Sequence, residues 1–78
     1  RGEAPLYPRR AKEEGVAGWV DLEFTISRDG IPGNLRVVAA EPRGVFEKSV
    51  LKAVEQWRYA PLPAARQAAL RLRFAVED

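Results

Sequence analysis

Residues 19–27 are Trp-Val-Asp-Leu-Glu-Phe-Thr-Ile-Ser, and every second side chain in this run is apolar. A strict period of two over nine residues predicts a β-strand with one buried face. The core side chains expected from this strand are Val20, Leu22, Phe24 and Ile26. Because Asp-Gly is a strong signal for a tight hairpin, the dipeptide Asp29-Gly30 predicts that the chain turns back into a second strand.

The second strand is expected to cover residues 31–41 and to continue the buried face with Leu35, Val37 and Ala39. Pro32 lies near its start. Because proline has no N–H to donate to a ladder, this part of the strand should lie at an edge or contain a bulge.

Two helices are expected around these strands. A long helix should cover residues 45–57, since its apolar side chains recur at helical spacing and form one face. A short helix should run from Pro8 to Glu14 and stop at Gly15, because glycine readily adopts the left-handed conformation that ends helices. The core side chains expected from the long helix and its ends are Phe46, Val50, Val54 and Trp57.

A third strand is expected at residues 69–76, where apolar side chains again alternate with polar ones. The element order is therefore short helix, strand, strand, helix, strand, which predicts an α+β fold. In the simplest packing, a three-stranded antiparallel sheet carries the one long helix on its apolar face. With 78 residues the chain should form a single domain, residues 1–78, because two domains would be too small to fold.

The composition excludes several kinds of chemistry. The chain has no His, no Cys and no Met, so zinc sites, disulfides and catalysis by Cys or His are excluded, and we expect no metal and no cofactor. Asp21 and Glu23 lie on one strand face as an acid–base pair would, but nothing nearby completes a site, and we interpret them as a solvated face. The protein is therefore not expected to be an enzyme.

The charge, the length of the apolar runs and the missing Met add three further expectations. The formal net charge of +2 is spread along the chain, which does not favour nucleic-acid binding. No apolar run reaches the ~20 residues of a membrane span. Since a primary translation product normally starts with Met, we expect the chain to be an excised piece of a longer protein.

Several short motifs occur here together. The most specific feature is the pair formed by Tyr7-Pro8 before the short helix and Trp57-Arg58-Tyr59-Ala60-Pro61 after the long one. The further matching positions are Gly15, Gly18-Trp19-Val20, Phe24, Asp29-Gly30 and Phe46. By these motifs the chain resembles the C-terminal domain of TonB, the energy-transducing protein of Gram-negative bacteria, over about residues 5–76.

The resemblance implies a function that composition alone does not indicate. Members of the family are anchored in the inner membrane by an N-terminal helix, so this chain would be the soluble, periplasmic end of such a protein. Their C-terminal domain binds the TonB box, a short extended segment of TonB-dependent outer-membrane transporters. Energy from the proton gradient, relayed by an inner-membrane proton-channel motor complex, then drives uptake of iron-siderophore complexes, cobalamin or similar cargo.

The expected partner-binding site combines this resemblance with the physics of a sheet edge. An edge strand without proline can accept an extended peptide through backbone hydrogen bonds. In the family the Tyr-Pro pair lies next to the docked box and the basic residue after it meets an acidic group of the transporter, which carries over to Tyr7, Pro8 and Arg10. The strand that would pair with the box is Ala69, Leu70, Arg71, Leu72, Arg73, Phe74, Ala75 and Val76.

Several roles have two interpretations at this point. Tyr7 either anchors the N-terminal arm or touches the partner, and Trp19 is either covered by the N-terminal helix or available for binding. Arg71 and Arg73 face outward and either pair with acidic groups or protect the edge from unwanted pairing. The alternative functions are a periplasmic scaffold domain of the TolA type and, less favoured, a nucleic-acid-binding module. The open edge also allows pairing between copies, so a homodimer is considered as well.

Overall fold

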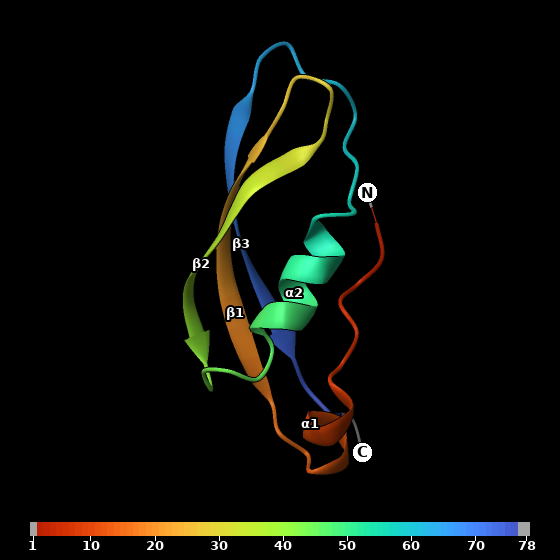
Figure 1. Cartoon of the computed structure of the whole chain (residues 1–78), viewed down its shortest axis with the longest axis vertical. Coiled ribbons are helices and arrows are strands. Elements are labelled where there is room, and N and C mark those ends of the chain that lie inside the picture. The colour runs from red at the N-terminus through yellow and green to blue at the C-terminus, as the bar shows by residue number, and fades with distance from the viewer. Residues whose placement is uncertain (1, 77–78) are drawn as a thin grey trace.

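In the described part of the chain, three strands form one sheet and two helices lie beside it (Figure 1). The computed structural model describes residues 2–76. The elements in chain order are α1 (Arg9–Glu13), β1 (Gly18–Ile26), β2 (Pro32–Glu41), α2 (Glu47–Val54) and β3 (Arg66–Phe74). The predicted α+β fold with a three-stranded antiparallel sheet is confirmed, and the strand order β2-β1-β3 places β1 in the centre.

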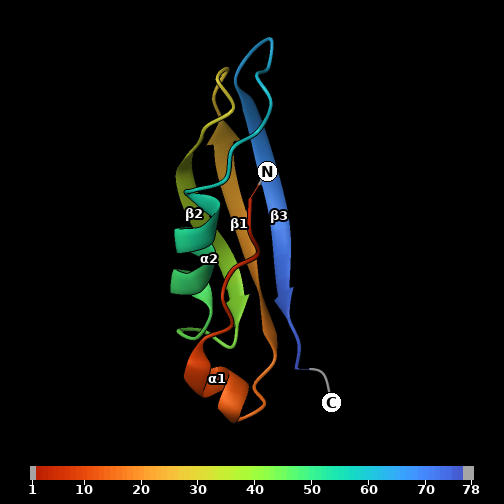
Figure 2. The same ribbon diagram turned by 90° about the vertical axis from the view of Figure 1, so that its right-hand side faces the viewer.

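One face of the sheet is covered and the other is open. On the covered face, α2 packs against β2. Residues 2–8, which we call the arm, run between α2 and β3 on the same face (Figure 2). The opposite face, which we call the outer face, has no described element over it (Figures 1 and 2).

The core lies between the sheet and the elements on its covered face. The alternation along β1 buries its apolar side chains, and α2 and the turn before it contribute three fully buried ones. Trp57, which the sequence placed in the core, is only half-buried at its margin. The buried side chains that form the core cluster are Ala11, Val20, Leu22, Phe24, Ile26, Phe46, Val50, Val54 and Phe74.

α2 has eight residues, so the prediction of a long helix over residues 45–57 is wrong. Gly44, with a φ of 81°, forms a turn before the helix, and its N–H donates to Oε2 of Glu47 at 2.9 Å. This bond lowers the pKa of the Glu47 carboxyl, and the helix begins at that residue, after the turn. At the other end, the N–H of Trp57 donates to the carbonyl of Val54, three residues back, which tightens the chain into a turn.

β2 is interrupted twice where it pairs with β1. The partners of Asp21 and Leu22 on β2 are not adjacent, so Val38 between them is a β-bulge. The bulge reverses the alternation of side chains, and Ala40 packs against the core, whereas Ala39, which was predicted to be buried, is exposed. The second shift lies near the hairpin, where the sequence indicated an edge or a bulge.

The hairpin between β1 and β2 turns at Gly30, which has a φ of 84°. The N–H of Gly30 donates to the carbonyl of Ser27, and its own carbonyl accepts the N–H of Tyr59, both at 2.8 Å. The N–H of Leu62 donates to the carbonyl of Arg28 at 2.8 Å. The segment that leads from α2 to β3 is therefore bonded to the tip of the hairpin.

Candidate partner-binding site

β3 is a regular strand at one edge of the sheet. It pairs with β1 without interruption, from Phe74 opposite Gly18 to Arg66 opposite Ile26. Within the described residues, no backbone hydrogen bond outside the sheet ladder reaches β3. β2 forms the other edge, but its register shifts break the row of bonding groups. β3 therefore presents the longer regular edge to which an extended segment can add.

The bounds of β3 differ from the residues 69–76 predicted for it. The strand starts earlier, at Arg66, because β1 continues as far as Ile26 and offers partners to an Ala-rich stretch that shows no alternation. It ends earlier because Phe74 lies opposite the first residue of β1. Ala75 and Val76, which the sequence included in the site, therefore follow the strand, whereas Ala69 to Phe74 belong to it.

The two faces of β3 differ in chemistry. The exposed side chains of its outer face are Gln67, Ala69, Arg71 and Arg73. The half-buried side chains of its covered face are Ala68, Leu70 and Leu72. The two half-buried leucines leave apolar surface against which side chains of an added strand can pack.

Arg71 is engaged inside the domain. Its Nε and Nη2 atoms donate to Oδ1 and Oδ2 of Asp21 at 2.6 and 2.9 Å, which is a bidentate pair between β3 and β1. Its guanidinium carbon lies 3.8 Å from the ring centroid of Trp19. The Arg71 guanidinium therefore covers the Trp19 ring. From the sequence, Trp19 was expected either to be covered by the N-terminal helix or to be available for binding.

Arg73 is the exposed cation next to this pair. It lies opposite Trp19 in the ladder, and none of the ion pairs in the described part of the chain includes it. The sequence treated Arg71 and Arg73 alike, but pairing with Asp21 distinguishes them. Of the two, Arg73 stays outside these ion pairs, and its charge adds to the lowering of the pKa of the Asp21 carboxyl.

The Arg71 guanidinium holds the pKa of the Asp21 carboxyl below its ordinary value of 3.8. Because this pKa is depressed in the folded state, the ionised pair stabilises the fold above that value, and the stabilisation is lost as the pH falls through the folded pKa. We expect Asp21→Asn to lower the urea midpoint of unfolding at neutral pH and to leave it unchanged well below pH 3.8. Equal losses at both pH values would contradict this role, and Glu55→Gln, the same chemical change at an exposed position, is the control.

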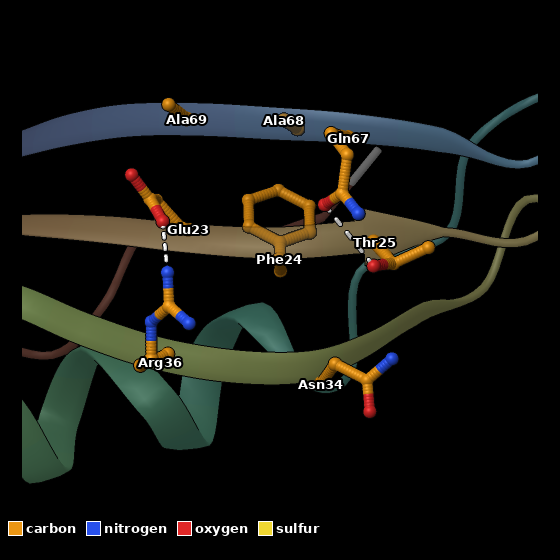
Figure 3. Close-up of a pocket in the computed structure, with 8 residues that line it drawn as sticks. All are labelled: Glu23, Phe24, Thr25, Asn34, Arg36, Gln67, Ala68 and Ala69. Carbon is orange, nitrogen blue, oxygen red and sulfur yellow. Dashed lines mark hydrogen bonds and ion pairs between the residues drawn. The ribbon is translucent and has the colours of Figure 1, made fainter.

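A shallow hollow of about 470 Å³ lies on the outer face, where the three strands run side by side. Figure 3 shows the residues that line it. Arg36 forms an ion pair with Glu23, and Oγ1 of Thr25 donates to Oε1 of Gln67 at 3.2 Å. These polar side chains pair across strands rather than converge on one point, so they are not arranged as a catalytic site. Among the described residues, no group of three or more His, Cys, Asp or Glu side chains could hold a metal ion.

Tyr7 anchors the arm to the core. Its ring packs edge-on against Phe46 and Phe74, with centroid distances of 5.6 and 5.5 Å. Its hydroxyl donates to the carbonyl of Val16. Of the two roles left open by the sequence, the structure shows the anchoring role, and it brings Tyr7 to the C-terminal end of β3.

Pro8 and Arg10 follow Tyr7 along the chain. Pro8 is the residue before α1. Arg10 is exposed on α1, and its Nε donates to Oε2 of Glu14 at 3.2 Å. An exposed pair of this spacing is worth only ~0.3–0.5 kcal/mol, so Arg10 can change partners at little cost.

The sequence patterns did not indicate the contacts of the arm with α2 and the turn after it. The indole N–H of Trp57 donates to the carbonyl of Glu3 at 2.8 Å, and the hydroxyl of Ser49 donates to the carbonyl of Leu6. Both acceptors are backbone carbonyls, which every residue type carries. No pattern of residue types could therefore have revealed these contacts.

The sequence of this chain is similar to those of known proteins. The family described as Gram-negative bacterial TonB protein C-terminal matches residues 3–76. The chain belongs to this TonB C-terminal family.

The TonB protein of Pseudomonas aeruginosa is 34% identical over 82 residues, which cover 99% of the chain and 24% of that protein. The TonB protein of Escherichia coli K12 is 37% identical over 57 residues, which cover 73% of the chain and 24% of that protein. The chain thus spans about a quarter of the length of these TonB proteins.

Solved structures of TonB proteins share the fold. The solution NMR structure of the Pseudomonas aeruginosa TonB C-terminal domain matches this chain with a TM-score of 0.92 at 34% identity. The match covers 100% of this chain and 84% of the chain in that structure. The TonB2 protein of Vibrio anguillarum matches with a TM-score of 0.81 at 31% identity, over 95% of this chain and 76% of its own. The resemblance to TonB inferred from the motifs is therefore confirmed. No helix in the described part of this TonB-type domain is long and apolar enough to cross a bilayer.

Proposed function

We propose that this domain binds the TonB box of TonB-dependent outer-membrane transporters by strand addition at the β3 edge. The observation that carries the proposal is the uninterrupted pairing of β3 with β1, which leaves a regular edge open on its other side. Leu70 and Leu72 lie half-buried along this edge on the covered face. Membership of the TonB C-terminal family supports the same site.

In this proposal the domain acts in the periplasm as the end of an inner-membrane-anchored protein. The part of that protein outside the domain connects it to a proton-channel motor complex, and the transporter uses the energy to take up iron-siderophore complexes or similar cargo. The domain binds and transmits force and catalyses no reaction. Its family membership favours this role over that of a TolA-type scaffold.

Two other kinds of partner are a second copy of the domain and nucleic acid. A homodimer formed by pairing of β3 strands would occupy the edge, so a second copy and a transporter segment would exclude each other. Nucleic acid is not expected as a partner, because Arg71 and Arg36 are paired with acidic side chains among the described residues and the formal net charge is only +2.

A peptide titration followed by NMR tests the proposal. We expect a synthetic TonB-box peptide to shift the backbone amide signals of residues 66–74 and of Tyr7, because these residues form and flank the edge. If peptides at millimolar concentration shift no signals there, the proposal is wrong.

Two modified peptides serve as matched controls. The N–H groups of a strand alternate between its two edges, so one peptide is N-methylated at its odd residues and the other at its even residues. Strand addition predicts that one of them loses binding and the other keeps it. Equal binding by both would show that side chains, rather than backbone hydrogen bonds, hold the peptide.

A further inference from the structure

The arm is held against the domain in two different ways along its length. The hydrogen bonds between residues 2–6 and α2 with the turn after it run from Trp57 to Glu3 and from Ser49 to Leu6, and Gly2 lies against the Trp57 ring. Among the described residues, no backbone–backbone hydrogen bond involves residues 2–7. Except for the half-buried Pro5, residues 2–6 are exposed, and the side chain of Leu6 is 82% exposed.

Tyr7 is held far more firmly. Its ring contacts two buried aromatic rings, and its hydroxyl is bonded to the carbonyl of Val16. Opening the contact at Tyr7 would expose apolar surface of the core, whereas opening residues 2–6 exchanges two hydrogen bonds for bonds to water and uncovers the half-buried surfaces of Pro5 and Trp57. The two parts of the arm should therefore open separately, since regions with few buried contacts open at a lower free energy than the core.

We propose that residues 2–6 form a releasable latch, which opens from α2 while Tyr7 and the rest of the domain stay folded. The geometry sets the order of release. Glu3 lies next to Trp57, after the C-terminal end of α2, and Leu6 lies next to Ser49 in its first turn, so the arm runs opposite to α2 (Figure 2). A pull on the chain before residue 2 loads the Trp57 contact first, the Ser49 contact next and Tyr7 last.

The use of the latch, though not the latch itself, rests on the proposed function. In a domain that transmits tension, opening of residues 2–6 frees roughly 17 Å of extended chain before the load reaches the core. Tyr7 is then the point at which the tension enters the fold. A small change of tension is absorbed by the latch, and the sheet with its β3 edge stays intact.

The test uses a substitution that disturbs the latch alone. A Cβ atom on Gly2 would lie 2.2 Å from Cδ1 of Trp57, so Gly2→Ala pushes the arm away from the indole. We expect hydrogen exchange of the Trp57 indole N–H to become about fivefold faster or more, the effect of losing one hydrogen bond. The heteronuclear NOE of residues 3–6 should fall as well. Exchange of the backbone amides of Val20 and Leu22 in β1 should not change.

Glu3→Ala is the matched control, because only the backbone carbonyl of Glu3 takes part in the contact. This change should leave the indole N–H as slow as in the original chain. The proposal is overturned if Gly2→Ala speeds exchange in β1 as much as at Trp57, because the arm would then open only with the whole domain. It is also overturned if the indole N–H stays unchanged. No partner peptide enters this test, so its outcome is independent of the peptide titration described above.

Discussion

Replacing Gly30 with alanine should lower the free energy of unfolding by about 3 kcal/mol. The φ of 84° at this position costs ~1–2 kcal/mol for a residue with a Cβ atom. In addition, the Cβ would lie 2.0 Å from the carbonyl oxygen of Tyr59, so the segment that is bonded to the turn has to move. For a domain of this size, the loss corresponds to a fall in Tm of roughly 12–24 °C, which thermal unfolding followed by circular dichroism would measure.

Gly33→Ala is the matched control in the same hairpin. Nothing lies within 4 Å of a Cβ built at Gly33, and its φ is not positive. This substitution should therefore change Tm little. Similar losses for both variants would show that the hairpin resists any added side chain, and would contradict the specific role of Gly30.

Phe46→Ala should cost about 4 kcal/mol of stability. The side chain is fully buried at 0% exposure, and its ring stacks on that of Phe74 with a centroid distance of 4.2 Å. Its removal leaves a cavity among the aromatic rings and takes away one of the two rings on which Tyr7 packs. Urea unfolding at neutral pH would measure the loss.

The control for this change is Val38→Ala, which shortens a side chain that is 53% exposed at the bulge of β2. Surface changes of this kind are usually within about 0.5 kcal/mol of neutral. If Phe46→Ala cost no more than Val38→Ala, the aromatic cluster would not hold the arm and the end of β3 together.

The parts of the fold that the sequence predicted are those set by local patterns. The alternation in β1 fixes which side chains face the core, and Asp29-Gly30 marks the hairpin, because each signal is carried by neighbouring residues. The family motifs implied that Tyr7 lies next to a docked box, which stays a prediction; in the structure Tyr7 contacts Phe74 at the end of β3.

The parts that the sequence did not predict depend on contacts between distant residues. The ends of β3 follow from where β1 begins and ends, and the bulge at Val38 follows from how β2 fits against β1. The difference between Arg71 and Arg73 appears only when Asp21 is placed opposite one of them. The helical spacing of apolar residues in the sequence continues past α2 to Trp57. The backbone tightens into a turn there, however, and the spacing of apolar residues carries no information on such a change.

The bonds from the segment after α2 to the hairpin tip have a consequence for β3. They tie Tyr59 and Leu62 in place shortly before the strand begins, so the point at which the chain enters β3 is set by the hairpin. A slip of β3 by a single residue along β1 would turn Leu70 and Leu72 to solvent and Arg71 toward the core. The hairpin tip therefore sets the register of β3 on β1. This register decides which side chains of β3 an added strand would meet at each position.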